Sequence, residues 1–336
     1  MARICIIPKA TQTGGVTSFQ RKLSVGLAAR GINICTNLHD GPVDAVLLTG
    51  GVRDLSGLWR ARQRGIRIVQ RLDGINWLHR RLRTGARHFL RAEYGNRLLA
   101  LLRSRFVSQI VYQSEFVHGW WKARFGQERV PTCIIHNGVD LTVFTPDGPG
   151  VRRADCFRML LVEGSLQGGY EAGLETALGL AELLGEKVPI ELVVVGRVST
   201  KVQSGYQARS RVPVEWAGLV PHEKIPALDR SADMLYSADV NAACPNSVIE
   251  ALACGLPVTA FATGALPELV SGDAGRLVAY GGDPWKLEKP DLPALAQAAM
   301  EILQNQGVFR PAARRRAEEA FSLDLMVDRY LNALLG

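Results

Sequence analysis

The sequence lacks several features that would assign it to a familiar class. None of its six cysteines forms a Cys-x-x-Cys pair, which argues against a zinc site or a disulfide framework and favours reduced thiols. No apolar run approaches the roughly 18 residues that a membrane-spanning helix needs. The opening residues, MARICIIPKA, are expected to form a first strand with no signal peptide before it. We therefore expect a cytoplasmic protein.

Three sequence motifs are also missing. The glycine-rich stretch VEGSLQGGYE (162–171) lacks the Gly-Lys-Ser/Thr ending of a phosphate-binding P-loop, and no lysine or arginine occurs between Arg158 and Lys187. No metal-binding Asp-x-Asp stands at an expected strand end. A helix-turn-helix signature and interleaved aromatic residues are absent, so nucleic acid is not the expected partner despite an isoelectric point of 9.4.

Positive charge is concentrated in the first half of the chain. Residues 1–150 hold 22 lysines and arginines against 9 acids, a net charge of +13, whereas residues 151–336 hold 18 against 23, a net charge of −5. Eight arginines and one glutamate lie in residues 77–106, interspersed mainly with leucines. This pattern favours a helix lying on an anionic membrane surface or binding a phosphorylated ligand; a solvated helix face explains it equally well.

The 336 residues are too many for one ordinary core, and strands alternate with helices twice. We predict an α/β protein with two doubly wound Rossmann-like domains, 1–150 and 151–310, followed by a terminal helix over 311–336. Strands are expected over 3–10, 44–51, 66–73, the first part of 109–116, 132–140, 157–165, 189–197, 214–220, 233–240 and 256–263. Helices are expected over the later part of 14–31, after a loop, from the end of 109–116, and over 173–185, 224–233, 247–255 and 309–335.

Loops that follow strands are where such sheets bind ligands. Gly14 and Gly15 lie between an expected strand and a helix, where backbone N–H groups can approach an anion or make a tight turn. In CPNSVIEALACG, Ser247 and Glu250 have the Ser-x-x-Glu spacing of a helix capping box, which would explain the acid without any ligand.

The stretch NSVIEALACGLPVTAFATGALPELVSGDAGRLV (246–278) closely resembles the donor-binding region of GT4-type retaining glycosyltransferases, which have the GT-B fold. HNGVDLTVF (136–144), GGVTSFQRKLSVGLAARG (14–31) and EEAFSLDLMVDRYLNAL (318–334) are similar to further segments of that family. The resemblance implies two Rossmann-like domains facing a cleft between them. It also implies a sugar transferase that needs no metal or other cofactor.

The resemblance further implies that Glu250 binds the ribose hydroxyls of a UDP- or GDP-linked sugar, since a carboxylate accepts two hydrogen bonds from a vicinal diol. Neighbouring positions of the same motifs belong to this donor site. They are Gly15, Asn246, Ser247 and Gly264.

The chain departs from the family at the donor phosphates. Ala242 replaces a first acid, and Ser165 and Gln167 stand where an arginine and a lysine are usual. We expect Arg197 or Lys201, in the next strand-to-loop segment, to supply the cation instead.

The acceptor is expected on the N-terminal domain. Asp73 stands where the family has the acid of a His-Asp pair and is the candidate catalytic residue, although an Asp-Gly turn also explains it. Arg71 and Arg80 are expected to meet a phosphate on a glycan, lipid-linked or small-molecule acceptor. The departures leave an alternative, a nucleotide- or sugar-binding regulatory partner that keeps the fold without catalysis.

Overall fold

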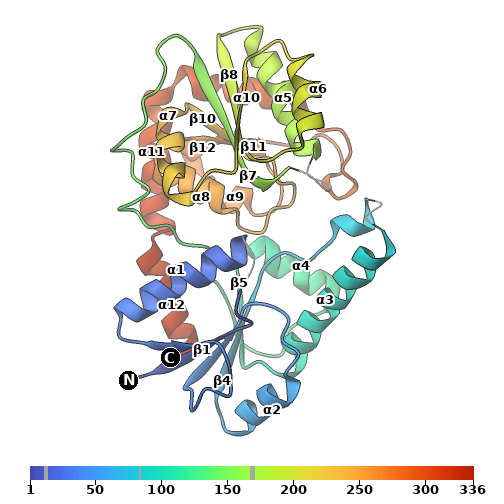
Figure 1. Ribbon diagram of the computed structural model, residues 1–336, viewed down its shortest axis with the longest axis vertical. Helices are drawn as coiled ribbons and strands as arrows, with labels where there is room; N and C mark the ends of the chain where they lie inside the picture. Colours follow the sequence, from blue (N-terminus) through green and yellow to red (C-terminus); the bar gives the residue numbers. More distant parts are fainter. Residues whose placement is uncertain (11–13, 83–84, 167–170) are drawn as a thin grey trace. The chain divides into compact units, whose positions relative to one another are not determined.

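The computed structural model describes residues 1–10, 14–82, 85–166 and 171–336. The chain forms two compact units (Figure 1). The first contains Met1–Gly138 together with Leu323–Gly336, and the second contains Val139–Ser322.

The first unit is built on a parallel sheet in the order β2-β1-β3-β4-β5-β6. Its central strands are buried on both faces, as a parallel sheet between two helical layers requires. The strands are β1 (Arg3–Ile7), β2 (Asn33–Cys35), β3 (Ala45–Leu48), β4 (Arg67–Leu72), β5 (Gln109–Tyr112) and β6 (Thr132–Ile134).

Helices cover both faces of this sheet (Figure 1). They are α1 (Gly15–Ala29), α2 (Leu55–Gln63), the 3-10 turn η1 (Leu78–Arg80), α3 (Ala86–Arg105), α4 (Glu115–Phe125) and α12 (Leu323–Leu335). The last helix packs on α1, where the rings of Phe19 and Tyr330 lie 5.1 Å apart. Arg30 adds ion pairs to Asp324 at 3.0 Å and Asp328 at 2.7 Å.

The second unit repeats the pattern with a parallel sheet in the order β12-β11-β10-β7-β8-β9. The chain therefore reverses its direction of travel across the sheet between β7 and β10, the position at which doubly wound sheets bind ligands. The strands are β7 (Phe157–Ser165), β8 (Ile190–Arg197), β9 (Val214–Gly218), β10 (Met234–Tyr236), β11 (Val258–Phe261) and β12 (Gly275–Val278).

Two separate apolar clusters fill the two faces of this second sheet. One joins α8 and α11 to the strands, through residues such as Val248, Leu252 and Ala313. The other joins α5 and α10, through Leu178 and Ala299. The helices are α5 (Glu171–Gly185), α6 (Thr200–Gln207), η2 (His222–Lys224), α7 (Ile225–Ser231), α8 (Asn246–Ala253), α9 (Leu266–Leu269), η3 (Gly272–Ala274), η4 (Pro284–Lys286), α10 (Leu292–Gln304) and α11 (Gln306–Ala320).

The units meet in sequence at Gly138 and Val139, whereas the sequence placed the domain boundary at 150/151. The segment before the expected boundary, from Val139 to Gly150, belongs to the second unit. Phe144 is buried in its core. Arg230 donates to the carbonyl oxygens of Pro149 at 2.5 Å and Thr145 at 3.1 Å.

Two expected helices are divided in the structure. The single helix expected over 309–335 is interrupted at Phe321 and Ser322, which lie between α11 and α12. Of these two helices, α12 alone belongs to the first unit. The terminal segment of that unit therefore begins at Leu323, whereas the sequence predicted a terminal helix from residue 311. The arginine-rich region 77–106 likewise contains the short turn η1 before α3 starts at Ala86.

Candidate functional site

The carboxyl edge of the second sheet carries most of the residues that the sequence singled out. Because all six strands are parallel, Ser165 at the end of β7 and Arg197 at the end of β8 lie at one edge. The loops after β10 and β11, which lead to α8 and α9, leave the sheet at the same edge. The reversal point between β7 and β10 lies among them.

Glu250 does not form the capping box that its spacing with Ser247 allowed. Helix α8 begins at Asn246, and Pro245 is its N-cap, without a side-chain hydrogen bond to the helix end. Ser247 is therefore already the second helical residue, so it cannot act as the capping hydroxyl. The capping explanation for Glu250 is wrong.

Glu250 instead turns into the unit and meets His222. Its side chain is 6% exposed, and its Oε1 lies 2.9 Å from Nε2 of His222, which is 35% exposed. His222 is the first residue of η2, and its ring centroid lies 5.2 Å from that of Phe144. Helix α8 and the turn η2 thus bring together a buried carboxylate and an imidazole.

A second buried acid lies close to Glu250. Asp229 of α7 is 1% exposed, and burial, followed by the charge of Glu250, raises its pKa well above the usual range. A side-chain hydrogen bond with Cys254 and the charge of Arg230 oppose that rise. Burial and the nearby charge of Glu250 therefore both disfavour the ionised form of Asp229.

The loops after β10 and β11 are joined by their backbones. Gly264 has φ +59°, and a Cβ there would lie 2.5 Å from both the nitrogen and the oxygen of Ala242. Ala265 donates its N–H to that same oxygen at 2.8 Å. Only glycine fits at position 264, so this residue fixes the spacing between the two loops.

The expected cations lie on β8 and the helix after it. Ser165 is directly paired with Arg197 in the sheet register, and both are exposed. Lys201 is exposed in the first turn of α6, behind the N-cap Ser199. Arg197 therefore stands beside the position where the family has its arginine. Gln167 lies outside the described residues.

Two carboxyl groups at the reversal point had not been singled out from the sequence. Glu163 lies on β7, and Asp239 lies just after the neighbouring strand β10. Both side chains are half-buried. Burial, and then the charge of Asp239, raises the pKa of Glu163 to about 8. Burial raises the pKa of Asp239 to about 6. The sequence could have indicated them, because each acid stands at or just after the end of an apolar strand: Glu163 in VEGS (162–165) and Asp239 in YSAD (236–239).

Asp73 and Arg71 lie together at the carboxyl edge of the first sheet. Asp73 directly follows β4, and its carbonyl oxygen accepts from Trp121 Nε1 at 2.8 Å. Burial raises its pKa, and the Arg71 guanidinium opposes that rise at 3.9 Å. Arg71 itself is 3% exposed, stacks on Phe19 at 3.9 Å and donates to Asn137 at 3.2 Å. Arg71 thus supports the edge from within rather than facing solvent.

Gly15 begins α1 at the same edge, and among the described residues no atom lies within 4 Å of where its Cβ would be. Gln20 of α1 holds the end of the segment 8–10. The amide of Gln20 donates to Pro8 O at 2.7 Å and to Thr49 Oγ1 at 2.6 Å, and its oxygen accepts from Ala10 N. Within the described part of the chain, the start of α1 therefore has room for a ligand beside Gly15.

Arg80 lies beside a hollow of about 670 Å³ on the first unit. It pairs with Glu93 at 2.6 Å. The hollow is lined by apolar and basic side chains and one acid: Arg80, Phe89, Leu90, Glu93, Tyr94, Arg97 and Arg124.

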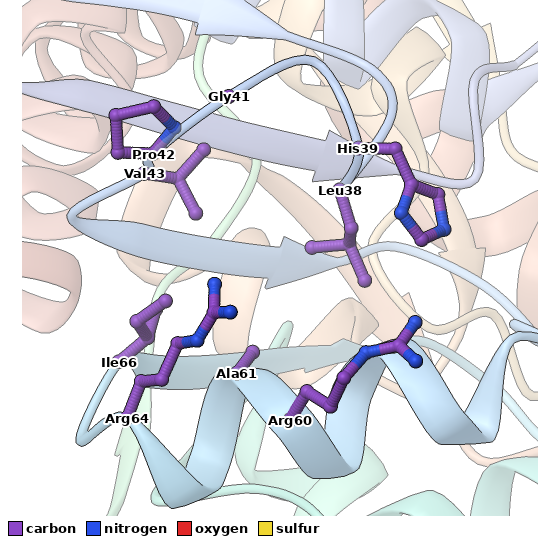
Figure 2. Close-up of a pocket in the computed structure, with 10 residues that line it drawn as sticks. Leu38, His39, Gly41, Pro42, Val43, Arg60, Ala61, Arg64 and Ile66 are labelled. Atoms are coloured by element: carbon purple, nitrogen blue, oxygen red, sulfur yellow. The ribbon is translucent and has the colours of Figure 1, made fainter.

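A second hollow, of about 420 Å³, lies between α2 and the β2–β3 loop (Figure 2). The side chains of Arg60 and Arg64 extend from α2 below Leu38 and Val43. None of the residues expected in the donor or acceptor site lines it.

Two features are absent from the residues that the structure describes. In the described ranges, no three histidine, cysteine or acidic residues gather as they would around a metal ion. Within the same ranges no helix combines the length and the apolar character needed to cross a membrane.

Comparisons with known proteins agree with this architecture. Over 99% of its length the chain superimposes on sucrose-phosphate synthase from Thermosynechococcus elongatus, covering 98% of that chain with a TM-score of 0.75 at 16% identity. The Anabaena protein HepE, solved in complex with UDP-glucose, gives a TM-score of 0.71 at 15% identity with 99% of both chains covered. These likenesses confirm the GT-B fold.

The sequence of the second unit matches a family model. Residues 158–305 match the model of the family glycosyl transferases group 1. A 2-deoxystreptamine N-acetyl-D-glucosaminyltransferase from Streptomyces fradiae is 28% identical over 145 residues, 40% of this chain and 31% of that protein. A component of the human phosphatidylinositol N-acetylglucosaminyltransferase is 27% identical over 143 residues, 41% of this chain and 28% of that protein. These matches span less than a third of either curated relative. The predicted resemblance to the group 1 glycosyltransferases is confirmed.

Proposed function

We propose that the protein is a retaining glycosyltransferase that moves a sugar from a UDP- or GDP-linked donor to a glycan, lipid-linked or small-molecule acceptor. The observation that carries the proposal is Glu250. It is a buried carboxylate at the carboxyl edge of the sheet, in the part of the chain that matches the family. The helix cap that would have explained it without a ligand is not formed.

Donor binding would use several groups at this edge. Glu250 would accept hydrogen bonds from the ribose diol. Asn246 and Ser247 supply N–H groups at the start of α8, where the helix dipole favours an anion. Arg197 and Lys201 would neutralise the diphosphate from the neighbouring strand and helix.

The transfer would break the bond between the anomeric carbon and the donor phosphate and form one to the acceptor oxygen. Retention requires that the acceptor attack on the face from which the phosphate leaves, and a donor phosphate oxygen would take the acceptor proton. The chain would stabilise the growing charge on the diphosphate with amides and cations, without a metal ion. Asp73 would contact a sugar hydroxyl during this step.

The acceptor side would include an anionic membrane surface. The first turns of α3 expose Phe89 (41%), Leu90 (68%) and Tyr94 (55%) next to arginines such as Arg97 and Arg124. Apolar rings and guanidinium groups together suit the boundary between lipid headgroups and acyl chains. The side chain of Leu102, by contrast, is fully buried, so the C-terminal half of α3 packs on its own unit.

A second candidate is a nucleotide- or sugar-binding protein without catalysis. Glu163 and Asp239 favour it, because they place carboxyl groups at the reversal point where a diphosphate would lie. Ala242 and Ser165 remove an acid and a cation that the family has.

Replacing Glu250 with Gln tests the proposed function. The Gln oxygen still accepts from His222, so the fold is retained, while two charge-assisted hydrogen bonds to ribose are weakened. We expect Glu250→Gln to lose about 2–3 kcal/mol of binding free energy, so that its Kd for UDP or GDP rises roughly 30- to 150-fold.

Isothermal titration of the wild-type and variant proteins with UDP and GDP measures this change. Glu186→Gln, at an exposed acid after α5, is the matched control and leaves affinity unchanged. A folded Glu250→Gln protein with wild-type affinity contradicts ribose binding by Glu250.

A further inference from the structure

We infer that His222 is a positioning residue for nucleotide binding, which holds the Glu250 carboxylate in the orientation that recognises ribose. The inference rests on the proposed function, because it assigns to His222 a part in the same site. Nothing in the sequence pattern connects the two residues, which lie 28 positions apart.

The geometry supports this role. Nε2 of His222 lies 2.9 Å from Oε1 of the Glu250 carboxylate. A carboxylate has about four lone-pair sites, so the imidazole contact does not exhaust its capacity to accept from a diol. The His222 side chain is more exposed than that of Glu250, at 35% against 6%. The imidazole thus fixes the acid from the solvent side of the pair.

The ring of His222 is itself held in place. Phe144 lies against it, with the rings at 50° and their centroids 5.2 Å apart. Phe144 is 2% exposed and belongs to the core of the same unit. The imidazole therefore has a fixed support on one side and the carboxylate on another.

The surroundings of Glu250 place it near a second buried acid. Asp229 from α7 lies near enough that Glu250's charge contributes to its raised pKa. Buried Cys254, at the end of α8, shares a side-chain hydrogen bond with Asp229. The charge of Arg230, on α7, lowers the pKa of both Asp229 and Cys254. From α11, Arg314 is engaged with the carbonyl oxygen of Ala253 at 2.8 Å.

These neighbours leave the largely buried Glu250 beside another acid. An N–H donor to a buried carboxylate stabilises its charged form. Loss of the His222 donor would therefore weaken the charged, oriented form of the acid, which accepts from ribose. His222 therefore determines how strongly the site distinguishes ribose from a sugar that lacks its hydroxyls.

The test compares UDP, GDP and ADP with their 2′,3′-dideoxy counterparts by isothermal titration. For the nucleotide that binds, we expect the wild-type protein to prefer ribose by about 30-fold or more, from the loss of two hydrogen bonds. His222→Phe keeps the ring against Phe144 but donates no hydrogen bond, and we expect its preference for ribose to fall below about 5-fold.

His222→Gln restores an N–H donor, so we expect it to recover part of the preference. A purely structural role of His222 would lower the affinity for both forms of the nucleotide equally and would leave the preference intact. His39→Phe is the matched control, because His39 also contacts a carboxylate, that of Asp54 at 3.2 Å, in the other unit. Thermal unfolding establishes that each variant is folded.

The outcomes separate this inference from the proposed function. If His222→Phe discriminates ribose as well as the wild-type protein does, the inference is overturned and the proposed function stands. If the wild-type protein binds none of the probes, or binds ribose and dideoxyribose forms equally, ribose recognition by Glu250 is overturned, and His222 loses its role with it.

Discussion

The carboxyl pair at the reversal point makes a quantitative prediction about stability. Glu163 has a pKa of about 8 in the folded protein and an ordinary one when unfolded. The folded state therefore binds one more proton than the unfolded state between these two values. Stability from this group is present at low pH and is lost as pH rises through about 8.

The magnitude follows from the width of that pH range. Between pH 6 and 8 a group with a folded pKa near 8 removes about 2 kcal/mol of unfolding free energy. Water reaches the half-buried carboxyl and screens part of this, so about 1–2 kcal/mol is expected. Glu163→Gln has no such proton, so relative to the wild-type protein it becomes more stable by this amount as pH rises from 6 to 8.

Urea unfolding of both proteins at pH 6, 7 and 8 measures the difference, and titration of the groups that do not interact with Glu163 cancels in the comparison. In Tm the same change corresponds to roughly 2–8 °C for a unit of this size. Glu186→Gln, at an exposed acid, should show the pH dependence of the wild-type protein. Equal pH dependence in wild type and Glu163→Gln would refute the account of this pair.

Three further predictions concern other parts of the chain. Replacing Arg197 and Lys201 together by Met should weaken binding of a nucleoside diphosphate at least about 10-fold and that of the nucleoside little; equal losses in titrations contradict their role. Sedimentation with phosphatidylglycerol vesicles at low salt should remove the protein from solution, whereas neutral vesicles, added salt or Leu90→Ser should leave it there; equal sedimentation with both lipids rejects membrane attachment. Arg230→Met leaves two carbonyl oxygens of the 145–149 segment without their donor, so Tm should fall by several degrees; an unchanged Tm contradicts that anchoring.

Much of the fold could be predicted because apolar strands and amphipathic helices are local patterns. The strand over 157–165 and the helix following it have nearly the expected bounds. The short strands Asn33–Cys35 and Gly275–Val278 were not among the predicted elements, since three or four residues give no clear periodicity. The break at Ser322 was missed because helical propensity continues on both sides of it.

The site was less predictable, because its contacts join distant parts of the chain. Spacing alone allowed a capping box at Glu250, and only the position of Pro245 as N-cap excludes it. The contact with His222 depends on how α7 and η2 pack beside α8. The pKa of Glu163 depends on burial and on Asp239, neither of which a single strand sequence contains.

The most direct test of the central claim is release of nucleoside diphosphate from a sugar donor. The wild-type protein is incubated with UDP-glucose, UDP-N-acetylglucosamine and GDP-mannose, and slow hydrolysis by water is followed when no acceptor is present. We predict release from one of these donors by the wild-type protein, and at least about 10-fold slower release by Glu250→Gln under subsaturating donor. Tight binding of a nucleotide without release from any donor would contradict catalysis and establish the non-catalytic alternative.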